Sequence, residues 1–106
     1  MSGRMDKINA LVRAELGRTL GSIQPAGAMA TVTMVKTSSD LAEAKAWISL
    51  LPDSDTAWQE LAGRLPELQA GLAERLVIKR TPRLTLRRDR SGEHAHRITQ
   101  LLDGDG

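Results

Sequence analysis

The side chains with the clearest capacity for binding chemistry are six arginines gathered within residues 80–97. A guanidinium group is planar and offers a fixed fork of donors that matches the oxygens of a phosphate. Residues 75–97 carry eight basic and two acidic side chains, which is typical of a surface that meets a polyanion. The candidate phosphate-binding residues are Lys79, Arg80, Arg83, Arg87, Arg88, Arg90 and Arg97.

A plainer interpretation of the same arginines is a charged face that only keeps the protein soluble. Lys79 and Arg80 also follow a predicted helix, where cations stabilise the helix dipole without binding anything. The formal net charge of the chain is only +2, because residues 40–74 carry seven acidic and two basic side chains. A polyanion would be repelled by that acidic block, so we expect binding on one side of the molecule only.

Catalytic and metal chemistry has little support in the sequence. The chain has no cysteine, which excludes disulfides, thiol nucleophiles and thiolate metal sites. His94 and His96 are two positions apart, so on a helix they point in different directions, and no third ligand lies nearby. Serine, histidine and aspartate all occur, but no motif brings them together as a triad. We therefore expect no catalytic residue, no metal, no cofactor and no enzyme.

Two tryptophans are the only aromatic residues, which excludes a binding platform made of several stacked rings. Trp47 alternates with Ile48 in a predicted strand, so two interpretations remain open: an exposed ring that stacks on a base, and a half-buried sheet residue. Trp58 falls on the apolar stripe of a predicted helix and is expected in the core. Asp40 follows two serines and is expected to cap a turn.

The elements that position these residues begin with a predicted amphipathic helix over residues 4–23. Pro25 and Gly27 end that helix. The apolar positions recur every three or four residues and therefore share one stripe of the helix. They are Ile8, Leu11, Val12, Leu16, Thr19, Leu20 and Ile23.

Two predicted strands follow, over residues 28–37 and from about residue 44 to 51, joined by a turn that contains Ser38 and Asp40. A helix that starts at Leu41 is the alternative for the second segment. Strict alternation in the first strand predicts one face with Met29, Thr31, Thr33 and Val35 and another with Ala30, Val32, Met34 and Lys36.

Two short helices are predicted after Pro52. The first has Ser54, Asp55 or Thr56 as its cap, and the second starts at Pro66. A third strand over residues 83–89 then alternates, with its cationic side chains outward. A last short helix is predicted over residues 93–102, and residues 103–106 are expected to form a flexible tail.

The predicted fold class is α+β, as one domain over residues 1–106. The order is α-β-β-α-α-β, followed by the short C-terminal helix. The first two strands suit an antiparallel hairpin, and the third suits parallel pairing after a helical crossover. Because three strands cannot bury themselves, the helices should back one face of the sheet. No segment is long and apolar enough to span a bilayer, and no secretory signal is visible.

Three segments of the chain resemble the ribosome-binding factor A family. Residues 31–49 are similar to its hairpin, in which two strands flank a Ser-Asp-Leu sequence and an alanine. Residues 78–89 are similar to a segment of the family in which basic residues and a proline precede a strand that ends at an aspartate. Residues 91–102 match its C-terminal pattern, and the first helix fits as well. The resemblance therefore covers nearly the whole chain.

The resemblance implies a type II KH-like fold that lacks the Gly-x-x-Gly loop of ordinary KH domains. It also implies a monomeric cytoplasmic assembly factor without catalytic activity. The implied partners are the free 30S ribosomal subunit and 16S rRNA, whose late maturation, including that of the 5′ end, the factor assists. On this basis the arginines are expected to contact rRNA phosphates, which position the protein without reading base sequence.

The chain departs from the family pattern in three places. Arg64-Leu65-Pro66 stands where the family usually has a small-residue Ala-x-Gly kink, Arg83 replaces the usual glutamate, and the chain ends soon after the last predicted helix. A different interpretation also remains, in which a non-ribosomal interaction or RNA-binding adaptor uses the acidic middle helices. Steep salt dependence of binding favours phosphate contact, whereas a flat dependence favours a protein partner.

Overall fold

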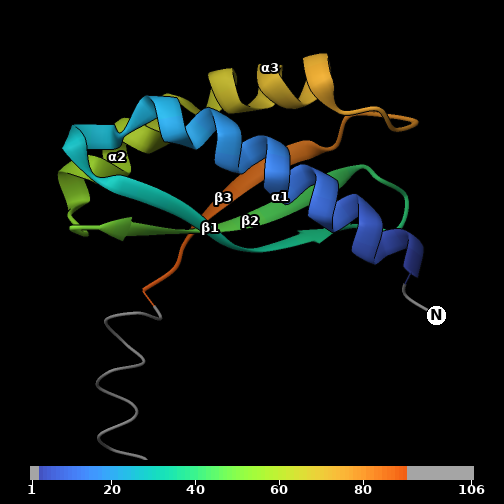
Figure 1. Ribbon diagram of the computed structural model, residues 1–106, viewed down its shortest axis with the longest axis horizontal. Helices are drawn as coiled ribbons and strands as arrows, with labels where there is room; N and C mark the ends of the chain where they lie inside the picture. The colour runs from blue at the N-terminus through green and yellow to red at the C-terminus, as the bar shows by residue number, and fades with distance from the viewer. Residues whose placement is uncertain (1–2, 91–106) are drawn as a thin grey trace, which may run out of the picture.

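The computed structural model describes residues 3–90 of the chain. The predicted order α-β-β-α-α-β is confirmed, with an added 3-10 turn after the first helix. The predicted helix over residues 93–102 and the tail 103–106 lie outside the described residues. The elements, shown in Figure 1, are α1 (Gly3–Ile23), η1 (Pro25–Gly27), β1 (Met29–Thr37), β2 (Glu43–Leu51), α2 (Asp55–Gly63), α3 (Leu65–Arg75) and β3 (Arg83–Arg88).

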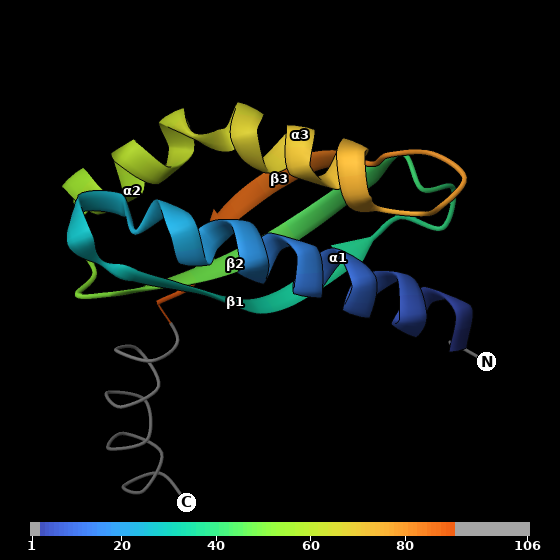
Figure 2. The same ribbon diagram turned by 45° about the horizontal axis from the view of Figure 1, so that its top comes forward.

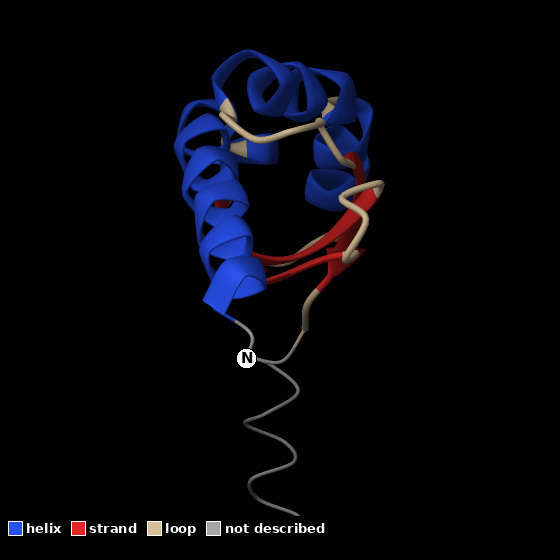
Figure 3. Ribbon diagram, turned by 90° about the vertical axis from the view of Figure 1, so that its right-hand side faces the viewer, coloured by secondary structure: helices blue, strands red, loops and turns tan. Residues whose placement is uncertain are grey.

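The three strands form one mixed sheet with β2 in the centre. β1 pairs antiparallel with β2, as a hairpin does, and β3 pairs parallel with β2 after the crossover through α2 and α3. The predicted strand pairing is therefore confirmed, and the alternative of a helix from Leu41 is wrong because residues 43–51 are a strand. Figure 3 shows the helices together on one side of the sheet, and no helix within residues 3–90 covers the other side.

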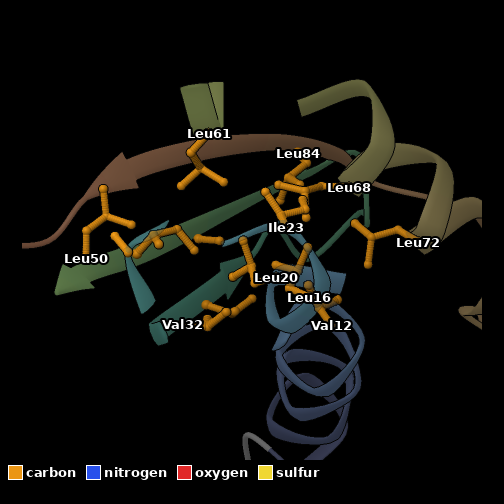
Figure 4. Close-up of a cluster of buried hydrophobic side chains, with 14 of the residues drawn as sticks. Val12, Leu16, Leu20, Ile23, Val32, Leu50, Leu61, Leu68, Leu72 and Leu84 are labelled. Carbon is orange, nitrogen blue, oxygen red and sulfur yellow. The ribbon is translucent and has the colours of Figure 1, made fainter. Parts of the chain in front are cut away.

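The core lies between the helices and the sheet (Figure 4). Ile8, Val12 and Leu16 are spaced four residues apart on α1, so they form one buried stripe that packs on β1 and α3. The prediction that Leu11 shares this stripe is wrong, since Leu11 is 49% exposed. It lies one residue before Val12, and neighbouring residues of a helix point about 100° apart, so Leu11 is turned away from the core. Among the described residues, the most deeply buried side chains include Leu16, Leu20, Ile48, Leu61, Leu68 and Leu72.

The turn between β1 and β2 is stabilised by the side chain of Asp40. Its carboxylate accepts hydrogen bonds from the Ser38 hydroxyl at 2.7 Å and from the Ala42 N–H at 3.0 Å. The bond from Ser38 is the main cause that lowers the pKa of Asp40 below its ordinary value. The predicted capping role of Asp40 is confirmed, and this turn fixes the register of the hairpin.

A single residue, Arg64, separates α2 from α3. The hydroxyl of Ser54 caps α2 by accepting a hydrogen bond from the Ala57 N–H at 3.0 Å, so Ser54 is the cap among the three predicted candidates. Arg64 separates the two helices with φ −97° and ψ 8°, and Pro66 lies in the first turn of α3. Arg64 therefore interrupts the helical backbone directly after Gly63, the last residue of α2.

A β-bulge in β1 changes which side chains face outward. The register of β1 against β2 shifts between Val32 and Met34. The extra residue reverses the alternation, so Val35 is buried and Met34 is exposed. The predicted faces were therefore right as far as Val32 and wrong beyond it, because a bulge cannot be recognised from alternation alone.

Candidate nucleic-acid interface

The face of the sheet opposite the helices is referred to below as the open face. Alternation and pairing register assign its residues, because neighbouring strands bring side chains of one face into rows. The open face comprises Met29, Thr31, Met34 and Lys36 of β1, Glu43, Lys45, Trp47, Ser49 and Leu51 of β2, and Arg83, Thr85 and Arg87 of β3.

β3 presents Arg83 and Arg87 on the open face, and both are exposed. Gln69 of α3 holds the start of this strand in place. Its side-chain amide donates to the Pro82 carbonyl oxygen at 2.9 Å and accepts from the Leu84 N–H at 2.8 Å. Because Leu84 is buried under the helices, its neighbours along the strand must point outward. The predicted outward side of this strand is confirmed.

Two lysines join these arginines on the open face. Lys36 and Lys45 are direct register partners in the hairpin, and Lys45 is in turn level with Thr85 of β3. Lys36 and Lys45 are both exposed. The four cationic side chains therefore come from all three strands.

Lys79 and Arg80 lie in the loop between α3 and β3, and both are exposed. α3 ends at Arg75, four residues before Lys79. The interpretation that these two cations serve only the helix dipole is therefore wrong, since that interaction falls off beyond the last turn. Arg80 instead lies close enough to Asp40 to contribute to the lowered pKa of that carboxyl group.

The loop also brings Lys79 next to the start of α1. A hollow of about 560 Å³ is lined by the apolar side chains of Ile8, Leu41 and Ile78 and by the cationic residues Arg4, Lys7 and Lys79. Figure 2 shows the start of α1, the β1–β2 turn and the α3–β3 loop at the same end of the molecule. Arg4, Lys7, Lys79 and Arg80 are referred to below as the cationic end.

Arg88 points to the other side of the sheet and is engaged by carboxylates. Its guanidinium contacts the Asp53 carboxylate at 3.0 Å and the Asp55 carboxylate at 2.8 Å, and its central carbon lies 5.9 Å from the centre of the Trp58 ring. The side chain is only 18% exposed. The hydrogen bond with Asp55 raises the pKa of Arg88 and lowers the pKa of Asp55. Arg88 therefore fastens the end of β3 to the start of α2.

Arg90 lies near the same carboxylates at longer range, 3.7 Å from Asp53 and 3.8 Å from Asp55, and its side chain is 55% exposed. Arg97, together with His94 and His96, lies outside the described residues. The structure thus divides the predicted cluster. Arg83 and Arg87 are on the open face, Lys79 and Arg80 are at the cationic end, and Arg88 and Arg90 are drawn towards acidic side chains.

The two tryptophans lie on opposite sides of the sheet. Trp47 is half-buried on the open face, in register with Met34 and Arg87. Trp58 is partly buried and packs against the core cluster beneath Arg88. The expectation for Trp58 is thus confirmed in its placement, although its ring also serves as the platform for a cation.

Residues 3–90 contain no group of three or more histidine, cysteine or carboxylate side chains that could hold a metal ion. No helix in this part of the chain is long and apolar enough to cross a membrane.

Sequence reasoning missed Arg4, Lys7, Lys36 and Lys45 as members of the cationic surface. Arg4 and Lys7 are more than 70 residues from Lys79 in the chain, and only the helical crossover brings them together. Lys36 and Lys45 could have been found from the hairpin register. The predicted alternation placed Lys36 with Val32, however, because it did not include the bulge.

The family model for ribosome-binding factor A matches residues 4–102 of this chain. The chain belongs to the ribosome-binding factor A family. A relative with that name from Akkermansia muciniphila is 34% identical over 106 residues, which covers 97% of this chain and 85% of the relative. Another from Opitutus terrae is 30% identical over 107 residues and covers 97% of this chain and 88% of the relative.

Solved structures of ribosome-binding factor A proteins share the fold. The crystal structure of the Thermus thermophilus protein has a TM-score of 0.69 at 21% identity and covers 79% of this chain and 94% of that chain. A homology model of the Thermus thermophilus ribosome-binding factor A, fitted into a cryo-EM map of a 30S complex, has a TM-score of 0.68 at 23% identity. It covers 77% of this chain and 91% of that chain.

One departure from the ribosome-binding factor A pattern, Arg83, changes the charge of the open face. Arg83 stands at the position where the family usually has glutamate, and it is exposed at the start of β3 on the open face. Its register partner on β2 is Glu43, so opposite charges are neighbours there. Arginine at this position extends the positive charge of the open face towards the cationic end.

Proposed function

We propose that this chain is a ribosome-assembly factor that binds the free 30S subunit through 16S rRNA and assists late maturation of that rRNA, including its 5′ end. It acts by binding, as a cytoplasmic monomer, without catalysis, cofactor or metal. Membership of the ribosome-binding factor A family supports the ribosomal partner. The fitted 30S complex of the Thermus thermophilus protein, which has a similar fold, also supports it.

The observation that carries the proposed binding surface is the grouping of exposed cations from separate segments. Arg83, Arg87, Lys36 and Lys45 lie on one face of the sheet, and the cationic end adjoins the start of β3. Folded rRNA presents a dense array of phosphates, and neutralising several of them at once is the main source of affinity in such complexes. These contacts would fix the position of the protein on the subunit.

The alternative function, an adaptor that binds a protein partner through the acidic side chains around α2 and α3, has less support. Asp53 and Asp55 already contact Arg88, and the Glu67 carboxylate contacts the Arg64 guanidinium. Carboxylates with partners inside the chain are less available to an external one. The structure therefore favours the cationic surface as the binding surface.

Co-sedimentation tests this function. The protein is expected to pellet with free 30S subunits and not with translating ribosomes, and its affinity should fall steeply as salt rises. Contact with about five phosphates corresponds to a slope of roughly −3.5 to −4.5 in a plot of log affinity against log salt concentration. Equal binding to both kinds of ribosome, or an affinity independent of salt, would contradict the proposal.

A further inference from the structure

An aromatic ring stands in the middle of the open face. Trp47 belongs to the central strand and is half-buried, so part of its ring is accessible. Its register partner on β1 is Met34, which is 47% exposed, and its partner on β3 is Arg87. A thioether, an indole and a guanidinium therefore form one row across the sheet. All three side chains lie outside the buried core cluster, so they are available to a ligand on this face.

The next row of the open face carries two positive charges directly opposite one another. Lys36 and Lys45 are register partners, and like charges in such a pair are destabilising unless an anion lies between them. A hollow of about 440 Å³ is lined by Lys36, Lys45 and Trp47, together with Thr37, Ser38 and Glu43. The hollow thus places an aromatic ring beside two cations, a combination that suits a base attached to a phosphate.

Two carboxylates lie near this row. Glu43 is level with Arg83 in the pairing of β2 with β3, so opposite charges are neighbours there. Asp89, just beyond β3, accepts a hydrogen bond from the Thr33 hydroxyl in the bulge of β1. Among the described residues, cations outnumber carboxylates on the open face, so the charge there is complementary to the phosphates of nucleic acid and unfavourable for a basic protein.

We propose that Trp47 stacks on an unpaired base of single-stranded RNA, whose flanking phosphates lie on Lys45 and Arg87. Lys45 lies two residues before Trp47 on β2, a separation of about 6.6 Å along the strand. Arg87 lies beside Trp47 on the neighbouring strand β3. Only an unpaired base can turn its flat side to an indole, because the bases of a duplex are already stacked on one another. The inference rests on the proposed function, since the strand would belong to the RNA of the small subunit.

Fluorescence of a protein with one tryptophan tests the stacking directly. The full-length Trp58→Phe variant keeps Trp47 as its only tryptophan, and the full-length Trp47→Phe variant keeps Trp58. Short oligoadenylate RNA is expected to quench the fluorescence of Trp47 and to leave that of Trp58 unchanged. A duplex RNA of the same length should quench neither. Absence of quenching of Trp47 by saturating oligoadenylate would overturn the inference.

The affinity for oligoadenylate distinguishes stacking by Trp47 from a purely structural role of this residue. Trp47→Thr keeps a residue that favours strands but removes the ring, and should weaken oligoadenylate binding about tenfold. Trp47→Phe should restore most of the loss, since phenylalanine can still stack. Circular dichroism should show the same fold for both variants.

Binding of free 30S subunits separates failure of this inference from failure of the proposed function. If Trp47→Thr binds oligoadenylate and 30S subunits like the wild type, the stacking is wrong and the proposed function stands. If the wild-type chain does not bind 30S subunits, the proposed function is wrong. If Trp47→Thr loses 30S binding while its binding to oligoadenylate is unchanged, the open face contacts a protein, and the inference is overturned.

Discussion

Replacing Arg83 and Arg87 together by alanine is expected to weaken binding to free 30S subunits by about a hundredfold or more. Each hydrogen bond to a charged group contributes about 1.5–3 kcal/mol, so the loss of two corresponds to about 3–6 kcal/mol. Both side chains are exposed on the open face, so the fold should be preserved. Co-sedimentation with purified subunits measures the affinity, and circular dichroism checks the fold.

A matched control changes the net charge by the same amount elsewhere. Arg18 of α1 and Arg75 of α3 are exposed on the helical side of the molecule, and both are replaced by alanine in the control variant. We expect this variant to keep most of its affinity, with a small loss from the long-range field of the whole protein. Equal losses in both variants would show that net charge, and not the open face, determines binding.

The neighbouring residues Arg87 and Arg88 should have opposite roles. Arg87→Ala should weaken 30S binding about tenfold or more, from the loss of one charged hydrogen bond, and leave the midpoint of urea unfolding unchanged. Arg88→Ala should lower that midpoint, because it removes the contacts with Asp53, Asp55 and the Trp58 ring. Affinity per folded Arg88→Ala molecule should stay within about twofold of the wild type. The reverse result would contradict the division of the arginines.

The ion pair between Arg88 and Asp55 should make the stability of the fold depend on pH. Arg88 lowers the pKa of Asp55 below its ordinary value of 3.8, so the folded state holds the charged carboxylate more strongly than the unfolded state does. This contribution to stability is fully present above the ordinary pKa and is lost as the pH falls through the lowered value. The difference in urea midpoint between the wild type and Arg88→Ala should therefore shrink in acid.

Much of the fold follows from local patterns in the sequence. The four-residue spacing of Ile8, Val12 and Leu16 is typical of a helix with one buried stripe, and the structure contains that helix. The short turn around Asp40 leaves only an antiparallel hairpin for the strands on either side. Local spacing and turn chemistry act over a few residues, so they can be recognised without knowledge of the tertiary structure.

The candidate site is harder to predict from local sequence patterns, because it depends on contacts between segments that are distant in the chain. One extra residue in β1 moved Met34 to the open face and Val35 to the core, and no feature of that segment distinguishes a bulge from plain alternation. Arg88 appears in the sequence as one more arginine of a cationic run. Its contacts with Asp53 and Asp55 depend on how the end of β3 meets the start of α2.

Photo-crosslinking tests most directly whether the open face contacts rRNA. Thr85 lies between Arg83 and Arg87 on β3, and a photoreactive residue at this position faces the same side as both arginines. Gln59 is exposed on α2, on the helical side, and provides the control position. In a complex with free 30S subunits, we expect position 85 to crosslink to 16S rRNA and position 59 to give little or no rRNA product. Crosslinking to rRNA from position 59 and none from position 85 would contradict the account.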